Sequence, residues 1–185
     1  MNKTKWIVLG VVVLAVIYVW SSYNSMIVLG QNADSQWAQV ESTYQRRFDL
    51  IPSLVNSVKG SLIQEQKVFG DIAEARTKYS GAKTPDEKAS AASQVESSLG
   101  RLLVIVENYP TLQSSQNIRD LMTSLEGTEN RINVERMRYN DMIKNFNILV
   151  KRFPTNILAG MFGQHERAYF EATSGASTAP TVNLQ

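Results

Sequence analysis

The chain has 185 residues, of which 43% are apolar and 19% charged, and its formal net charge is +2. This near balance argues against nucleic acid as a partner, because nucleic-acid-binding domains carry a basic patch or stripe. The absence of cysteine excludes disulfide bridges, thiol nucleophiles and thiolate metal sites. Ten glycines and five prolines are too few for a strand-and-turn fold and favour long helices.

The N-terminal segment has the composition of a membrane-spanning helix. Two lysines precede WIVLGVVVLAVIYVW, an uncharged run at residues 6–20. As a helix this run spans about 22 Å, less than the roughly 30 Å of a hydrocarbon core. The low-charge sequence that follows extends the segment to Gly30. We therefore predict a membrane anchor over residues 1–30, in contact with the lipid bilayer through residues 6–30.

A cleaved signal peptide is the alternative reading of this segment, and it would make the protein a secreted structural protein. Its apolar region would have about the observed length, but no A-x-A cleavage pattern follows the run. For a retained single-pass anchor, lysines before the span predict a cytoplasmic N-terminus. The remainder of the chain would then lie on the outer side of the membrane.

Apolar residues recur every three or four positions beyond the anchor, which predicts amphipathic helices. The first stripe begins at Trp37 and its helix ends in the loop YSGAKTPDEK. Thr84 is a suitable N-cap for the second helix, with Pro85 at the first helical position and Glu87 completing a capping box. The third helix runs from about residue 112 to Phe153.

These blocks predict an all-α fold, with an N-terminal transmembrane helix followed by an antiparallel bundle of three to four long helices. We place the bundle at residues 31–172. A fourth helix would come from residues 155–171 or from a break at Pro52. The low-complexity residues 173–185 are expected to be a disordered tail.

The stretch QRRFDLIPSLV interrupts the first apolar stripe with charged residues and a proline. Pro52 cannot donate a backbone hydrogen bond, and its ring disfavours a helical residue before it. Either a nearly continuous helix kinks here, or Asp49 caps a new helix. The stripe keeps its phase from Tyr44 to Val58, which favours the kink.

Arg47 falls on the apolar seam of this helix, where a guanidinium needs a carboxylate or several carbonyls. If the first and third helices run parallel, Glu126 or Asp120 lies level with it and would be its partner. Alternatively, Arg47 extends past Phe48 to solvent. A binding role is the remaining interpretation, in which Arg46 and Arg47 contact an anionic headgroup or glycan near the membrane.

The stretch TENRINVERMRYN mixes acidic and basic residues, including Arg131, as a solvated helix face does. Glu135 is the exception, because it falls where the seam expects an apolar group and could make one buried polar contact. Further along, Leu158, Met161 and Phe162 are candidates for an exposed apolar strip that contacts a protein partner.

Catalytic and metal-binding patterns are missing from the sequence. The single histidine, His165, has only Glu166 beside it, which gives no metal-ligand spacing. No P-loop, dinucleotide-binding glycine motif or nucleophile elbow occurs. We therefore expect no cofactor and no enzymatic activity.

Three stretches together resemble the LemA family. They are QRRFDLIPSLVNSVKG at residues 45–60, LEGTENRINVERMRYNDMIKNFN at residues 125–147, and RFPTNILAGMFG at residues 152–163, followed by YFEA. The resemblance implies a bacterial protein with an N-terminal membrane helix and an antiparallel helical bundle. It implies no enzymatic chemistry, and some members of the family are thought to have the opposite membrane orientation.

We therefore predict a non-enzymatic scaffold or adaptor anchored in a bacterial cell membrane, with unidentified protein partners. The short anchor, with tryptophan at both ends of its apolar run, also favours lateral association into homo-oligomers. The alternatives are a membrane-proximal ligand-binding or sensor module and the secreted structural protein.

Overall fold

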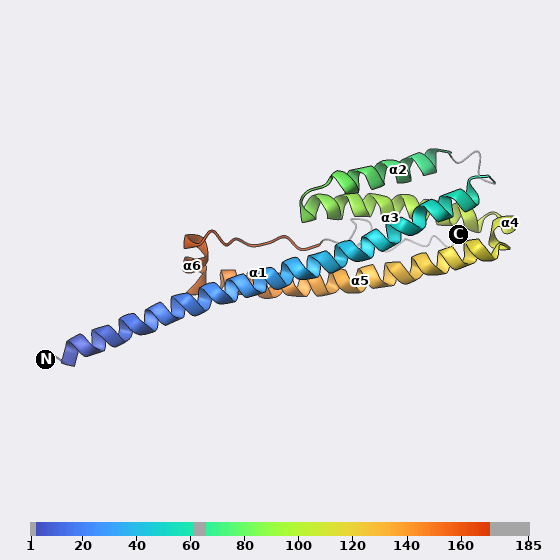
Figure 1. Ribbon diagram of the computed structural model, residues 1–185. Coiled ribbons are helices and arrows are strands. Elements are labelled where there is room, and N and C mark those ends of the chain that lie inside the picture. Colours follow the sequence, from blue (N-terminus) through green and yellow to red (C-terminus); the bar gives the residue numbers. More distant parts are fainter. Residues whose placement is uncertain (1–2, 61–65, 171–185) are drawn as a thin grey trace, which may run out of the picture. The chain divides into compact units, whose positions relative to one another are not determined.

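The computed structural model describes residues 3–60 and 66–170, which form helices and, within these ranges, no strand (Figure 1). The helices are α1 (Lys3–Val58), α2 (Gln66–Gly81), α3 (Pro85–Glu107), α4 (Pro110–Gln113), α5 (Gln116–Lys151) and α6 (Thr155–Met161). The expected all-α bundle with a long apolar N-terminal helix is confirmed. The predicted disordered tail at residues 173–185 lies outside the described residues.

The chain divides into two compact units. One comprises Met1–Ala38 and Met137–Tyr169, and the other comprises Gln39–Arg136 and Phe170–Gln185. We call them the first and second unit; α1 and α5 contribute residues to both. The division of the sequence into an anchor at residues 1–30 and a bundle at residues 31–172 stays a prediction.

The beginning of α1 is an apolar helix with little protein around it. Side chains at residues 6–18 are exposed, and Trp20 is 68% exposed. By length and composition α1 can cross a membrane, and only 6% of its most apolar stretch is buried. Soluble proteins rarely expose so much continuous apolar surface, so this segment supports association with a membrane.

Pro52 lies inside α1, so the helix passes through the QRRFDLIPSLV stretch without ending. Ile51 is 1% exposed whereas Pro52 is exposed, which places the ring on the outer side of the helix. Asp49 does not begin a new helix; its carboxylate accepts a hydrogen bond of 2.8 Å from Gln45 Nε2. The prediction that the helix continues through Pro52 is confirmed, the kink itself stays a prediction, and the alternative in which Asp49 caps a new helix is wrong.

The first predicted helix is nevertheless too long. It was expected to reach the loop that begins at Ser80, but α1 ends at Val58 and α2 begins at Gln66. Lys59 and Gly60 form a turn after α1, and glycine within a helix costs about 1 kcal/mol relative to alanine. The apolar stripe continues across this break because α2 also packs an apolar face against the bundle.

The beginning of α3 has the predicted capping box. Thr84 Oγ1 accepts a hydrogen bond of 3.2 Å from the Glu87 backbone N–H, and Glu87 Oε2 accepts one of 3.2 Å from the Thr84 N–H. The Lys83 N–H donates to the same carboxylate at 2.8 Å. These backbone N–H groups stabilise the ionised form and lower the pKa of Glu87.

Each unit buries apolar side chains from α1 and α5. In the first unit, the core joins α1, α5 and α6 through Met26, Phe146, Leu149, Val150 and Ala159. Leu158 is half-buried against this core, so it does not belong to an exposed strip as expected. In the second unit, residues of α1, α2, α3 and α5 that are 2% exposed or less include Val40, Ile51, Leu54, Ile72, Val95, Leu99, Leu102, Leu125 and Ile132.

Within each unit, α1 and α5 run antiparallel. In the first unit Gly30 packs against Phe146, and Trp37, further along α1, contacts Tyr139, which lies earlier in α5. In the second unit Tyr44 and Arg136 both contact Glu96, whereas Arg47, further along α1, pairs with Glu129, which lies earlier in α5. The assumption of parallel first and third helices is therefore wrong. The chain reverses direction once more than predicted, at the break after Val58. The sequence does not reveal this reversal, because the apolar spacing continues across the break.

Candidate functional site

The second unit contains a buried ion pair at its α1–α5 contact. Arg47 is 6% exposed, and its Nη1 binds Glu129 Oε2, whose side chain is 35% exposed. The expectation that Arg47 pairs with Glu126 or Asp120 is wrong, because the antiparallel direction of α5 brings Glu129 level with it. Arg47 therefore pairs with a carboxylate, and the alternative in which it extends past Phe48 to solvent is wrong.

A second polar group surrounds Glu96 of α3. Tyr44 OH donates a hydrogen bond of 2.8 Å to Glu96 Oε1, and Arg136 Nη1 lies 3.5 Å from the same oxygen. The side chains of Arg136 and Glu96 are 12% and 16% exposed. The ring of Phe170 lies against Arg136 and Tyr44. The centroid of this ring is 4.1 Å from the Arg136 guanidinium carbon and 6.4 Å from the centroid of the Tyr44 ring.

We call Tyr44, Arg47, Glu96, Glu129, Arg136 and Phe170 the polar cluster. Its members come from α1, α3, α5 and the segment that follows α6. Arg47 and Arg136 come from the first and second stretches that resemble the LemA family, and Phe170 comes from the YFEA sequence that follows the third. These three residues are far apart in the sequence, and the fold brings them into one small region of the second unit.

Burial dominates the electrostatics of the polar cluster. It raises the pKa of Tyr44, and the nearby Glu96 carboxylate adds to this effect. Burial also lowers the pKa of Arg47, while Glu96 opposes that change. Tyr79, which packs edge-on against Phe48 at 4.7 Å between centroids, likewise has its pKa raised by burial. Tyr44 therefore stays a neutral donor to Glu96, and the pairs act as packed structural contacts.

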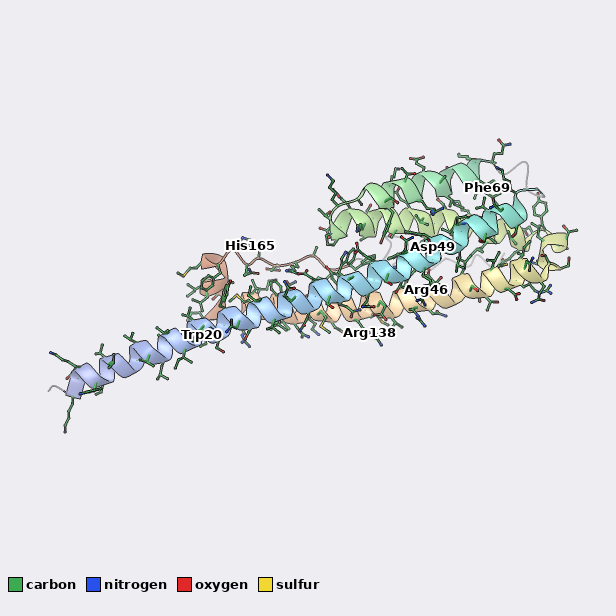
Figure 2. The ribbon with its side chains drawn as sticks, in the orientation of Figure 1. Trp20, Arg46, Asp49, Phe69, Arg138 and His165 are labelled. Carbon is green, nitrogen blue, oxygen red and sulfur yellow. The ribbon has the colours of Figure 1, made fainter. Side chains whose placement is uncertain are left out.

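The other residues predicted for a site are scattered over the surface. Arg46 and Asp49 are exposed on α1 (Figure 2), and Glu126 and Arg131 are exposed on α5. Glu135 is half-buried, in agreement with its position on the seam.

Sequence reasoning missed three members of the polar cluster: Tyr44, Glu96 and Phe170. Glu129 and Arg136 were noted only as part of a mixed charged face. The signal that would have found Glu129 is the register of an antiparallel α1–α5 pair. Glu96 carries no such signal, because its neighbours in α3 resemble an ordinary solvated helix face.

Acidic and histidine side chains do not gather into a metal site in the part of the chain that the structure describes. His165 is exposed in the segment after α6 (Figure 2).

That segment is fastened to the first unit through Arg167. The Asn147 side chain accepts from the Arg167 backbone N–H and donates to its carbonyl, both at 2.9 Å. Arg167 Nη1 lies 2.5 Å from Asp34 Oδ1 and 3.3 Å from the Gly30 carbonyl oxygen. The guanidinium also lies 4.9 Å from the centre of the Phe146 ring. The segment from the end of α6 to Arg167 is thereby fixed to α1 and α5.

The candidate contact residues in α6 and after it differ in exposure. Met161 is 75% exposed, whereas Phe162 is 39% exposed and makes an edge contact of 4.9 Å with Tyr23. Both are therefore accessible, with Phe162 partly occupied by a contact inside the unit.

Comparison with known proteins relates the chain to one family. The LemA family pattern matches residues 36–184. Two magnetosome proteins of Paramagnetospirillum magneticum, MamQ 1 and MamQ 2, are each 26% identical over 189 residues, covering 88% of this chain and 69% of the relative. The magnetosome protein MamQ of Magnetospirillum gryphiswaldense is 25% identical with the same coverage. The family match includes all three resembling stretches and the whole polar cluster, and the chain belongs to the LemA family.

Proposed function

We propose that this LemA-family protein is a membrane-anchored scaffold or adaptor that acts by contact and carries out no reaction. The observation that supports this function best is the continuity of α1. One helix of 56 residues contains the exposed apolar run at residues 6–20 and then packs in both units. A partner bound to the bundle would therefore be held by the same helix that enters the membrane.

The polar cluster supports a structural role for the buried charges. Its carboxylates and guanidinium groups bind one another, and its tyrosine hydroxyl is engaged by Glu96. Catalysis needs convergent groups that reach a substrate, whereas these groups hold helices together. The related MamQ proteins are named as magnetosome proteins, a name that specifies no reaction.

The protein would cross the bacterial cell membrane once, with its bundle on the outer side. This orientation follows from the two lysines before the span and the absence of another Lys or Arg before Arg46. Protein partners would contact exposed positions of the bundle, and a second copy of the chain is one candidate partner.

Photocrosslinking in intact cells tests the scaffold function. A photoreactive residue at exposed Val104 or Arg131 should give discrete adducts heavier than the chain. The same residue at Val95, which is 0% exposed in α3, is the matched control and should give none. Adducts should disappear when residues 6–20 are deleted. Equal adduct yields with and without the span, or none from either exposed position, would contradict a membrane-anchored scaffold.

A ligand-binding module is the second candidate, favoured by the exposure of Arg46 beside the buried Arg47. Because Arg47 is occupied by Glu129, Arg46 is the residue of this pair that can reach an anionic ligand. Arg46→Ala should then abolish salt-dependent binding of glycerol phosphate, used as a soluble headgroup probe, without changing the melting temperature. Unaltered binding would remove Arg46 from such a site.

A further inference from the structure

The short helix α6 exposes two of its large apolar side chains, although Leu158 packs against the core of the first unit. Thr155 and Ala159, one turn apart, are 0% and 1% exposed and face the first unit. Ile157 and Met161, also one turn apart, are 57% and 75% exposed. Phe153, in the turn before α6, is 80% exposed. A surface helix normally buries its large apolar residues, so this arrangement indicates a covering environment.

The attachment of α6 identifies what lies next to this face. Tyr18 OH and Thr155 Oγ1 are 3.1 Å apart, and the rings of Tyr23 and Phe162 are in edge contact at 4.9 Å. Both ends of α6 are therefore held beside residues 18–23 of α1. Trp20, which ends the uncharged run and is 68% exposed, lies in the same stretch (Figure 2).

The length of the apolar run shows why this position matters. Residues 6–20 span only about 22 Å, and a hydrocarbon core of about 30 Å requires roughly 20 helical residues. The span must therefore continue to about residue 25, although Ser21, Ser22 and Asn24 are polar. At that level of α1, the apolar surface is provided by the neighbouring α6 and the turn before it.

We propose that Phe153, Ile157 and Met161, which we call the α6 surface, insert into the lipid bilayer at its interface and complete the short span. The partner is a phospholipid surface, and the proposal rests on the membrane anchoring proposed above. One member of the α6 surface, Met161, was expected to belong to an exposed strip, with Leu158 and Phe162, that contacts a protein partner. The continuity of the α6 surface with the apolar run of α1 instead makes lipid its neighbour, because a bilayer around Trp20 must also reach α6.

The charged residues beside the α6 surface fit this placement. Lys151 is the last residue of α5 and Arg152 follows it, immediately before Phe153, and both are exposed. Lys151 Nζ pairs with Glu166 Oε2 at 2.7 Å, so Arg152 is the cation that can face lipid. Arg152 also lines an open groove of about 710 Å³ with Trp20 and Asn24. A cation at the edge of an apolar surface is suited to the phosphate groups of lipids, which lie just outside the hydrocarbon region.

Fluorescence quenching in liposomes tests the proposal on the full chain, which has no native cysteine. Single cysteines replace Ile157, Met161, Val12 in the span, and Asp141, an exposed residue of α5 about 15 Å along the helix from Lys151. Each is labelled with an environment-sensitive fluorophore. The liposomes contain phosphatidylglycerol and phosphatidylcholine brominated either near the headgroup or deep in the acyl chains.

We expect the labels at residues 157 and 161 to be quenched several-fold more than the label at Asp141. Shallow bromine should quench them more than deep bromine, and the order should reverse at Val12. Quenching at Val12 without quenching at residues 157 and 161 would overturn the proposal while leaving the anchor intact, as expected if the α6 surface binds a protein. Absence of quenching at Val12 would refute the anchoring itself.

Discussion

The buried ion pair between α1 and α5 leads to a quantitative prediction for Arg47→Met. Methionine keeps most of the apolar stem and removes the charge. Removing one partner of a fully buried pair costs about 3–5 kcal/mol, whereas exposed pairs contribute about 0–1 kcal/mol. Arg47 is 6% exposed, but the Glu129 side chain is 35% exposed and can be hydrated when left alone. We therefore expect a loss between these limits, about 2 kcal/mol.

Urea unfolding of the full chain in detergent, followed by far-ultraviolet circular dichroism, measures this loss. Arg46→Met is the matched control, because it makes the same change at the adjacent, exposed position, and it should alter stability by less than about 0.5 kcal/mol. Combining Arg47→Met with Glu129→Gln should be less destabilising than the sum of the single changes, by about 1 kcal/mol. Equal effects of Arg46→Met and Arg47→Met, with additive changes at Glu129, would refute the reasoning.

Three further substitutions examine other parts of the structure. Thr84→Ala removes the N-cap of α3 and should lower stability by about 1 kcal/mol; an unchanged unfolding midpoint would show that the cap is dispensable. Folding raises the pKa of Tyr44. The contribution of Tyr44 to the free energy of unfolding is therefore complete below its pKa in the unfolded chain, about 10, and is lost as the pH rises above that value. Tyr44→Phe should therefore flatten the decline in unfolding free energy between pH 9 and 11, and parallel declines would contradict this. Arg167→Ala breaks the contacts with Asp34 and Gly30, so proteolytic cleavage after Arg152 should become faster. Arg167→Lys should partly prevent this increase. An unchanged cleavage rate would mean that Asn147 alone holds the segment.

The helices themselves were largely predictable from the sequence. Apolar spacing located the helical stretches, although it joined the end of α1 and α2 into one helix. The Thr84 capping box identified one boundary because its hydrogen bonds are local. Pro52 was read correctly as lying within a continuous helix, since the apolar stripe keeps its phase across it. The uncharged run at residues 6–20 is likewise visible without any knowledge of packing.

The direction of the helices was not predictable in the same way. A break between Val58 and Gln66 leaves the apolar period nearly unchanged, because α2 also needs an apolar face. That single reversal exchanges parallel for antiparallel packing of α1 and α5, and so replaces Glu126 by Glu129 as the partner of Arg47. Register between distant helices depends on the number of reversals, and this one break changed the partner predicted for Arg47.

The polar cluster and the α6 surface show a second difficulty. Phe170 contacts Arg136 because of the path of the irregular segment after α6. The spacing of apolar residues does not predict the path of a segment that is not helical. In α6, the spacing of apolar residues predicts a helix but not which face it buries. The small residues Thr155 and Ala159 turn inward, and this preference becomes apparent only when the neighbouring α1 is in place.

Cysteine accessibility in intact cells tests the central claim of a single-pass anchor with an outer bundle. Single cysteines are placed at Thr4, before the apolar run, and at Asn130, an exposed residue of α5, in a chain that has no competing thiol. A maleimide that cannot cross the inner membrane should label the cysteine at residue 130 in intact cells, and the one at residue 4 only after permeabilisation. The reverse pattern would invert the orientation, and equal labelling of both positions in intact cells would contradict a membrane-spanning α1.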